Sequence, residues 1–253
     1  MDVTLDMAWL QAYLLVLLRT TLFIGIAPPF SNNSFPWRVK GLVAAGLALP
    51  FTGRVEIPDG GLGAGALLAA GTAEAATGAV LGVLVMVAFA AVASAGSLID
   101  LASGFQMATV YDPGSMVNGA QFTRLFQHGM IAMMLAAGAH IPLFLGFGTS
   151  FDAVALGEFP DMPSAAEAAG AAFTGMFAAA AQIAAPLIAV LFLADIGLGL
   201  LTRVAPTLNA FSLGFPLKIL VTLAFGGMVF GALPMAVGQL TDSAVELLRE
   251  VGP

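Results

Sequence analysis

The sequence predicts an all-α membrane protein. Of its 253 residues, 59% are hydrophobic and only 9% are charged, and the mean hydropathy of +0.98 is far above the average of soluble proteins. The hydrophobic residues gather in six apolar runs, at 8–27, 40–52, 62–104, 126–149, 168–202 and 213–240. Because a spanning helix needs about 20 apolar residues, these runs predict about six long helices.

The runs differ in length, and each is interpreted by its length. The run 8–27 matches one spanning helix, and we expect it to be retained because neither a basic leader nor a small-residue cleavage site accompanies it. The run 40–52 is short for a span. The runs 62–104 and 168–202 exceed a span, which requires tilt, kinks or burial inside an assembly. We therefore expect partly kinked helices.

Charged residues divide the connectors into two groups. The connectors 28–39, 105–125 and 203–218 are basic, whereas 53–61 and 150–167 are mostly acidic. The basic residues, including one at the start of the second run, are Arg38, Lys40, Arg124, Arg203 and Lys218. By the positive-inside bias, we expect the basic group to face the cytoplasm and both termini to lie on the opposite side.

The net charge of −7 argues against nucleic acid or an anionic lipid surface as the principal partner. The acidic connector contains Asp152, Glu158, Asp161 and Glu167, which we interpret as a solvated loop. The sequence has no cysteine, so disulfides, thiolate metal sites and cysteine nucleophiles are excluded.

Small residues recur within the apolar runs. Two pairs, Gly78 with Gly82 and Gly227 with Gly231, place glycines one turn apart on the same face of a helix. Such faces let helix backbones approach closely in lipid. The sequence is therefore expected to pack against many neighbouring helices.

The sequence contains no recognisable catalytic motif. His128 and His140 stand twelve residues apart, about 18 Å along a helix, so they cannot ligate one metal ion from one straight helix. We find no nucleophile elbow, no phosphate-binding loop and no dinucleotide fingerprint. We expect a protein that is not an enzyme and that needs no metal or cofactor.

Three acids, Glu74, Asp100 and Asp195, lie in or beside apolar runs, where an ionisable group indicates function. They could form a proton or ion pathway. Alternatively, they cap helix starts, pair with another subunit or lie beside water in a cavity. Asp195 and Arg203 are eight residues apart, which is too far for a direct pair on one straight helix.

Three motifs resemble, in order, those of the FliR family of flagellar export proteins, whose counterpart in virulence secretion machines is called SctT. The first motif is Arg19 followed by Ala27-Pro28-Pro29-Phe30-Ser31 and Phe35-Pro36-Trp37-Arg38-Val39-Lys40. The second runs from Ala95-Gly96-Ser97-Leu98-Ile99-Asp100 through Gly104-Phe105 to Asp112-Pro113-Gly114-Ser115 and Asn118. The third is the stretch from Asp195 to Lys218, with Gly199-Leu200-Leu201-Thr202-Arg203, Ala205-Pro206 and Gly214-Phe215-Pro216-Leu217.

This resemblance implies a non-enzymatic core subunit of the type III protein export gate, flagellar rather than virulence-associated. With FliP-like and FliQ-like subunits it would form the channel through which unfolded flagellar proteins cross the bacterial inner membrane, at the flagellar basal body. Family members resemble a fusion of the two partners, which implies a FliP-like portion at 1–167 and a FliQ-like helical hairpin at 168–253. A FlhB-like switch subunit, transient unfolded export substrates and membrane lipid would be the other partners, and nucleic acid would not.

Two groups of site residues follow from the resemblance. The loop 104–123 has the turn chemistry of Asp-Pro-Gly-Ser between apolar helices and resembles a plug across the closed channel. Its expected gating residues are Phe105, Met107, Tyr111, Asp112, Pro113, Gly114, Ser115, Met116 and Phe122. The stretch 203–218 is expected to form the bend of the hairpin, with prolines that end or kink the helices. The residues expected to serve assembly or the cytoplasmic tip are Asp195, Gly199, Arg203, Pro206, Gly214, Phe215, Pro216 and Lys218.

Two other functions stay open at this stage. A secondary transporter or ion channel would use Asp100 or Asp195 as an intramembrane carboxylate relay, but the sequence lacks the internal repeat expected of such a transporter. A scaffold for membrane-protein insertion would bind many clients without closing a pore.

Overall fold

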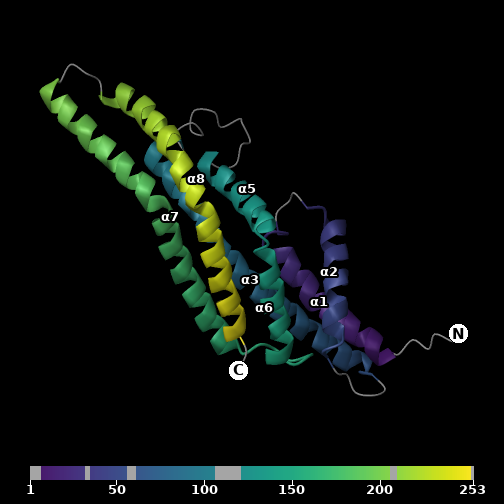
Figure 1. Cartoon of the computed structure of the whole chain (residues 1–253). Helices are drawn as coiled ribbons and strands as arrows, with labels where there is room; N and C mark the ends of the chain where they lie inside the picture. The colour runs from purple at the N-terminus through teal and green to yellow at the C-terminus, as the bar shows by residue number, and fades with distance from the viewer. Residues whose placement is uncertain (1–6, 32–34, 56–60, 106–120, 206–209, 252–253) are drawn as a thin grey trace. The chain divides into compact units, whose positions relative to one another are not determined.

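The computed structural model describes residues 7–31, 35–55, 61–105, 121–205 and 210–251. Within these ranges the chain forms α-helices and no strand, which confirms the all-α prediction. The helices are α1 (Met7–Ile26), α2 (Trp37–Thr52), α3 (Ala64–Ser103), α5 (Gln121–Ala136), α6 (His140–Ala153), α7 (Met162–Val204) and α8 (Ala210–Glu250) (Figure 1).

The predicted run 126–149 is divided into two helices. α5 ends at Ala136 and α6 begins at His140, with Gly138 between them at φ +71°. A glycine adopts this left-handed conformation readily, which ends a helix that its apolar neighbours would otherwise continue. Among the described residues, four helices are long and apolar enough to span a membrane, or up to five if the bent pair α5 and α6 counts as one span.

Three helices are much longer than a bilayer requires. α3, α7 and α8 contain 40, 43 and 41 residues, which correspond to about 60 to 65 Å against a hydrocarbon thickness of about 30 Å. Of the two roles expected of Pro216, to end or to kink a helix, the structure excludes the first, because α8 already begins at Ala210 and continues through Pro216 and Pro234. A proline removes one backbone hydrogen bond, a loss that a long apolar helix packed in a membrane protein tolerates.

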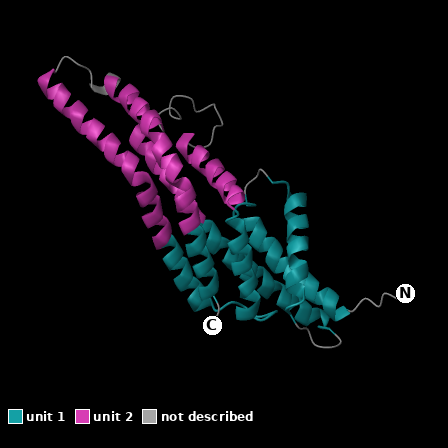
Figure 2. Ribbon diagram, viewed as in Figure 1, with its two compact units in different colours: residues 1–88, 138–173, 240–253 teal, residues 89–137, 174–239 magenta. Residues whose placement is uncertain are grey.

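The chain divides into two compact units, coloured separately in Figure 2. Unit 1 contains residues 1–88, 138–173 and 240–253, and unit 2 contains 89–137 and 174–239. Unit 1 therefore includes α1, α2, α6 and parts of α3, α7 and α8, whereas unit 2 includes α5 and the remaining parts of those three long helices.

Aromatic rings fill the core of unit 1 between α1, α2 and α6. The rings of Phe23 and Phe147 stack with centroids 4.3 Å apart, and Phe51 contacts both Phe147 and Phe151 at 5.8 and 5.4 Å. Gly148 makes room for this cluster, because a Cβ added there would lie 2.7 Å from the Phe51 ring. The burial of these rings stabilises the packing of the three helices.

The glycine pair of α3 contacts α1 at very short range. A Cβ at Gly78 would lie 2.3 Å from the backbone oxygen of Arg19, and one at Gly82 would lie 2.9 Å from Cβ of Ile26. The predicted close approach is thus confirmed for this pair. At Gly227 and Gly231 of α8 an added Cβ meets no described atom within 4 Å, so no described helix packs against α8 at these two positions.

In unit 2, α5 is amphipathic. Its buried face consists of residues four apart along the helix, namely Phe122, Phe126, Met130 and Met134. The Phe126 ring lies edge-on to Phe230 of α8 at 6.3 Å, and Gly129 leaves space for Phe230, since an added Cβ would lie 2.7 Å from that ring. This spacing places the apolar face of α5 against α8.

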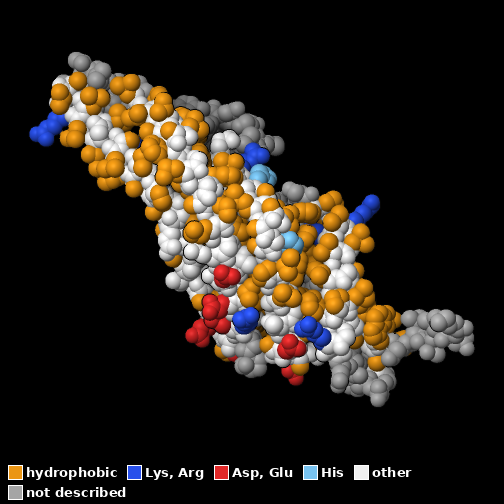
Figure 3. Space-filling view, viewed as in Figure 1, with side chains coloured by type: hydrophobic (Ala, Val, Ile, Leu, Met, Phe, Trp, Pro, Cys, Tyr) orange, Lys and Arg blue, Asp and Glu red, His pale blue; other side chains and the backbone are white. Residues whose placement is uncertain are grey.

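Large apolar side chains of α7 and α8 are exposed along much of their length. In the most apolar window of α3, 61% of the residues are buried, against 17% in α7 and 22% in α8. The exposed side chains include Phe177, Phe192, Leu193, Leu220, Leu223 and Met228. Figure 3 shows many hydrophobic side chains on the visible surface of these two helices, mainly on the part away from the C-terminus. Lipid or protein must cover such side chains.

The start of α7 carries its own cap. Asp161 precedes the helix and accepts hydrogen bonds from the hydroxyl and the backbone N–H of Ser164, the latter at 3.1 Å. These two bonds, the hydroxyl contributing more, lower the pKa of the exposed Asp161 carboxyl below its ordinary value. The acidic connector thus contains a helix cap, which satisfies backbone donors at the start of the helix.

We expect Gly78→Ala to destabilise the protein by about 1 to 3 kcal/mol, because the added methyl overlaps the α1 backbone and forces the helices apart. The measurement is the unfolding temperature in detergent. Gly231→Ala is the matched control, since its new methyl enters open space, and should leave the temperature unchanged or slightly raised. Equal stability of the two variants would contradict the close packing of α1 on α3.

Candidate functional site

Arg19 and Glu74 form an ion pair in the interior of unit 1. Arg19 lies on α1 and Glu74 on α3, and both side chains are fully buried. The guanidinium donates from Nε to Oε2 of Glu74 at 2.6 Å and from Nη2 to Oε1 at 3.0 Å. This bidentate geometry is the strongest arrangement available to an arginine and a carboxylate.

Backbone groups complete the coordination of this pair. Arg19 also donates to the carbonyl oxygens of Ser150 and Val154 at 3.0 and 3.2 Å, and Glu74 accepts from the N–H of Gly157 at 2.8 Å. Gly157 has φ +84°, and a Cβ there would lie 3.0 Å from Ala70, so glycine is required. The pair therefore connects α1, α3, the end of α6 and the connector that follows it.

The sequence indicated Glu74 as an intramembrane acid and Arg19 only as part of a family motif; it did not reveal their pairing. The two residues are 55 positions apart, and helix periodicity relates only residues on the same helix. A usable signal existed, because each is an isolated charge within an apolar run. Two opposite charges that must both leave water favour each other as partners.

Asp100 caps the start of α5 in unit 2. Its Oδ1 accepts from the N–H of Phe122 at 3.0 Å, and its Oδ2 accepts from the N–H and hydroxyl of Thr123 at 2.9 and 2.8 Å. Gly96 permits this contact, since an added Cβ would lie 2.7 Å from Cα of Thr123. The expectation that an intramembrane acid caps a helix start is confirmed for Asp100.

Two expected gating residues, Phe105 and Phe122, lie at the two ends of the loop 104–123. Their rings contact each other with centroids 5.8 Å apart, and Phe122 is buried. The other expected gating residues lie outside the described residues: Met107, Tyr111, Asp112, Pro113, Gly114, Ser115 and Met116. The contact between the two phenylalanines shows that the loop starts and ends at adjacent points.

Residues of α8 contact the end of α3 from which this loop begins. Lys218 Nζ lies 2.9 Å from Asp195 Oδ1 of α7 and donates to the carbonyl oxygen of Ala102 at 3.4 Å. A cation at a helix C-terminus is favourable because the last carbonyls carry partial negative charge. Gly104, at φ +83°, leaves room for the Phe215 ring, which lies 3.0 Å from the position of an added Cβ.

The bend of the hairpin is shorter than predicted. α7 ends at Val204 and α8 begins at Ala210, so Gly214, Phe215, Pro216 and Lys218 lie in the first turns of a helix and not in the bend of 203–218. Arg203 is exposed in the last turn of α7, and a Cβ at Gly199 meets no described atom within 4 Å. Pro206 lies outside the described residues. The assembly and tip roles expected of these residues stay predictions.

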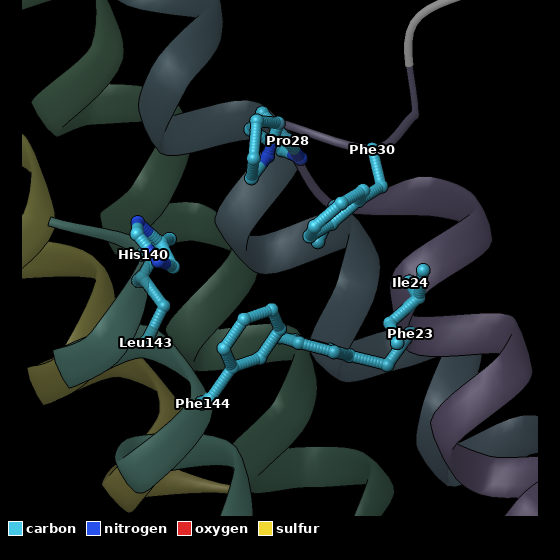
Figure 4. Close-up of a pocket in the computed structure, with 9 residues that line it drawn as sticks. Phe23, Ile24, Pro28, Phe30, His140, Leu143 and Phe144 are labelled. Atoms are coloured by element: carbon cyan, nitrogen blue, oxygen red, sulfur yellow. The ribbon is translucent and has the colours of Figure 1, made fainter. Parts of the chain in front are cut away.

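Neither histidine belongs to a cluster of side chains suited to chemistry among the described residues. No group of three His, Cys, Asp or Glu side chains there is placed to hold a metal ion. His140 lies edge-on to Phe144 and lines a crevice with Phe23, Pro28 and Phe30 (Figure 4). This crevice has no room for a water molecule, so we assign it no ligand.

The helices and these contacts define an all-helical membrane protein whose buried charges join helices and cap their ends. The model of the family described as bacterial export proteins, family 1, matches residues 10–244, and the chain belongs to this family. The predicted family resemblance is thereby confirmed.

Relatives agree with this assignment. The chain is 32% identical to the flagellar biosynthetic protein FliR of Escherichia coli (strain K12) over 249 residues, which cover 97% of this chain and 94% of that protein. It is 29% identical to FliR of Bacillus subtilis (strain 168) over 243 residues, which cover 95% and 94%. It is also 31% identical to the Yop proteins translocation protein T of Yersinia pestis over 149 residues, which cover 57% and 56%.

We expect Glu74→Gln to destabilise the protein by about 3 to 5 kcal/mol, because the Arg19 guanidinium stays buried without a counter-ion. The double variant Arg19→Met/Glu74→Leu removes both charges and should recover much of the lost stability. The test compares the unfolding temperatures of Arg19→Met, Glu74→Leu and the double variant. If the loss of stability in the double variant equals the sum of the losses in the two single variants, the two residues do not act as a unit.

Asp100→Ala should destabilise the start of α5 by about 1 to 2 kcal/mol, because the N–H groups of Phe122 and Thr123 lose their acceptor. Hydrogen exchange at these two amides should accelerate by about five- to thirtyfold. Asp152→Ala is a matched control in unit 1 and should leave both rates unchanged. Unchanged rates in Asp100→Ala would contradict the cap.

Proposed function

We propose that this protein is a non-enzymatic core subunit of the flagellar type III protein export gate. With FliP-like and FliQ-like subunits it forms the channel through which unfolded flagellar proteins cross the bacterial inner membrane at the basal body. The observation that carries this proposal is the similarity to FliR of Escherichia coli over 94% of that protein's length. The match to the Yop translocation protein covers little more than half of each chain, which favours the flagellar assignment.

The exposed apolar surfaces of α7 and α8 support membership in a hetero-oligomer. These helices are about twice as long as the hydrocarbon layer is thick, so lipid cannot cover their whole length. Apolar helices of partner subunits can cover the remainder. We assign residues 168–253, which contain almost all of these surfaces, to the FliQ-like hairpin and residues 1–167 to the FliP-like portion.

The contacts around the loop 104–123 support a gating role for it. Asp100 holds the start of α5 through three hydrogen bonds, while Lys218 and Phe215 contact the end of α3. A segment with both ends held on neighbouring helices can close a channel without displacing those helices. We assign the exposed end of α7 near Arg203 to contact with the FlhB-like subunit.

The transporter alternative has no supporting observation among these contacts. Both carboxylate oxygens of Asp100 accept hydrogen bonds from α5, and Asp195 is paired with Lys218. A relay needs a carboxylate that exchanges protons with a pathway, whereas these two groups hold helices together.

The test is co-expression of the tagged protein with FliP-like and FliQ-like subunits, followed by extraction in detergent and native mass determination. We expect a discrete complex with one copy of this chain and several copies of each partner. Gly199→Leu should lower the yield of complex severalfold while the chain alone keeps its unfolding temperature, since that glycine faces open space.

Recovery of the chain alone, or as a symmetric homo-oligomer, with both partners present would overturn the proposal. Normal assembly of the Gly199→Leu variant would show that α7 does not contact the partner subunits at Gly199. The rest of the proposal would stand. A matched Gly231→Leu variant tests the open face of α8 in the same way.

A further inference from the structure

The first turn of α2 lacks the groups that normally neutralise a helix start. Its N-cap residue is Pro36, which provides no side-chain hydrogen bond, and the first turn contains no acid. The N–H groups of Val39 and Lys40 bond to the carbonyl of Pro36, whereas those of Trp37 and Arg38 have no acceptor among the described residues. This helix end therefore presents two N–H groups that no described residue accepts, together with partial positive charge.

Two cations add to the positive charge of this turn. Arg38 is exposed, and Lys40 is only 5% exposed, with no hydrogen bond or ion pair to any described residue. Helical side chains lean toward the N-terminus, and Nζ of Lys40 accordingly lies 4.9 Å from the ring centroid of Trp37, the first residue of the helix. A cation over a ring gains about 0.5 to 2 kcal/mol, which does not replace a counter-ion.

Contacts with α1 place this turn at the edge of the membrane. α1 is a candidate span of 20 residues, or about 30 Å, which matches the hydrocarbon thickness, so a membrane crossed by α1 has its interface with water at the last turn of this helix. Trp37 contacts that turn, since a Cβ at Gly25 would lie 3.9 Å from its ring. Trp37 is itself 72% exposed, as is typical of a tryptophan among lipid headgroups.

We propose that the first turn of α2 binds the phosphate of an anionic phospholipid headgroup. The free N–H groups of Trp37 and Arg38, the guanidinium and the Lys40 ammonium provide donors and positive charge for one phosphate group. Val39 and Leu42, both exposed and apolar, follow within the next turn and contact the acyl chains of the same lipid. The occupant is a lipid because these apolar groups and Trp37 adjoin the donors.

This site is compatible with the net charge of −7. That charge argues against attraction of the whole protein to an anionic surface, whereas a single phosphate responds to groups within about 8 Å, the screening length of physiological salt. Arg54, just beyond the other end of α2, is a useful comparison: it is an exposed cation that lies 6.0 Å from the Phe51 ring and at no helix start.

The experiment uses the fluorescence of Trp37 in the full chain. The sequence has two tryptophans, so Trp9→Phe leaves Trp37 as the only one. This variant is placed in nanodiscs of phosphatidylcholine with a low fraction of brominated phosphatidylglycerol, or with the same fraction of brominated phosphatidylcholine. We expect stronger quenching by the phosphatidylglycerol, and a loss of this preference by about fivefold in Arg38→Gln and in Lys40→Gln. Arg54→Gln should keep it.

Equal quenching by the two brominated lipids, or a preference that survives in both Arg38→Gln and Lys40→Gln, would overturn the proposal. If Lys40→Gln unfolds, the quenching measured with Arg38→Gln decides the question, because Arg38 is exposed and its substitution should leave the fold intact. Added inorganic phosphate distinguishes a lipid phosphate from a free anion. If millimolar phosphate abolishes the preference for phosphatidylglycerol, the site binds a free anion and the lipid assignment is overturned. None of these outcomes depends on assembly with other subunits, so the proposal is tested separately from the export-gate function.

Discussion

The buried pair of Arg19 and Glu74 is the interaction on which unit 1 depends. The two charged residues and their three backbone partners come from α1, α3, α6 and the connector after α6, so four segments distant in sequence are tied at one point. Neither charge has access to water, and each would be costly alone. The close approach of Gly78 to the backbone of Arg19 follows from the same constraint, because the pair draws α1 and α3 together.

Unit 2 uses charges differently, at helix ends. Asp100 satisfies the first donors of α5, and Lys218 meets the last carbonyls of α3 while pairing with Asp195. Asp100 at the start of α5 and Lys218 at the end of α3 each lie where the dipole of that helix favours their charge. The two ends of the loop 104–123 are thereby held by electrostatic contacts, and the Phe105 and Phe122 rings add an apolar contact between them.

The sequence predicted the class of fold and the approximate helices because hydrophobic runs report directly on membrane helices. It missed the break at Gly138, since a single glycine in an apolar run is common and its φ of +71° is not visible in composition. The start of α8 at Ala210 was missed because the stretch 203–218, with its two prolines, was expected to form the bend of the hairpin. For the site, Asp100 as a helix cap was among the predicted alternatives, whereas the partners of Glu74 and Lys218 depend on contacts between distant segments that no local pattern specifies.

The burial of Arg19 has a consequence for how the protein enters the membrane. α1 is synthesised well before α3, so Arg19, the thirteenth of the twenty residues of α1, has no counter-ion when its helix first meets the translocon. An arginine near the centre of a helix opposes insertion by about 2.5 to 3.5 kcal/mol, and α1 has the lowest hydropathy of the four candidate spans. The arrival of Glu74 on α3 supplies the counter-ion and so favours the integration of α1.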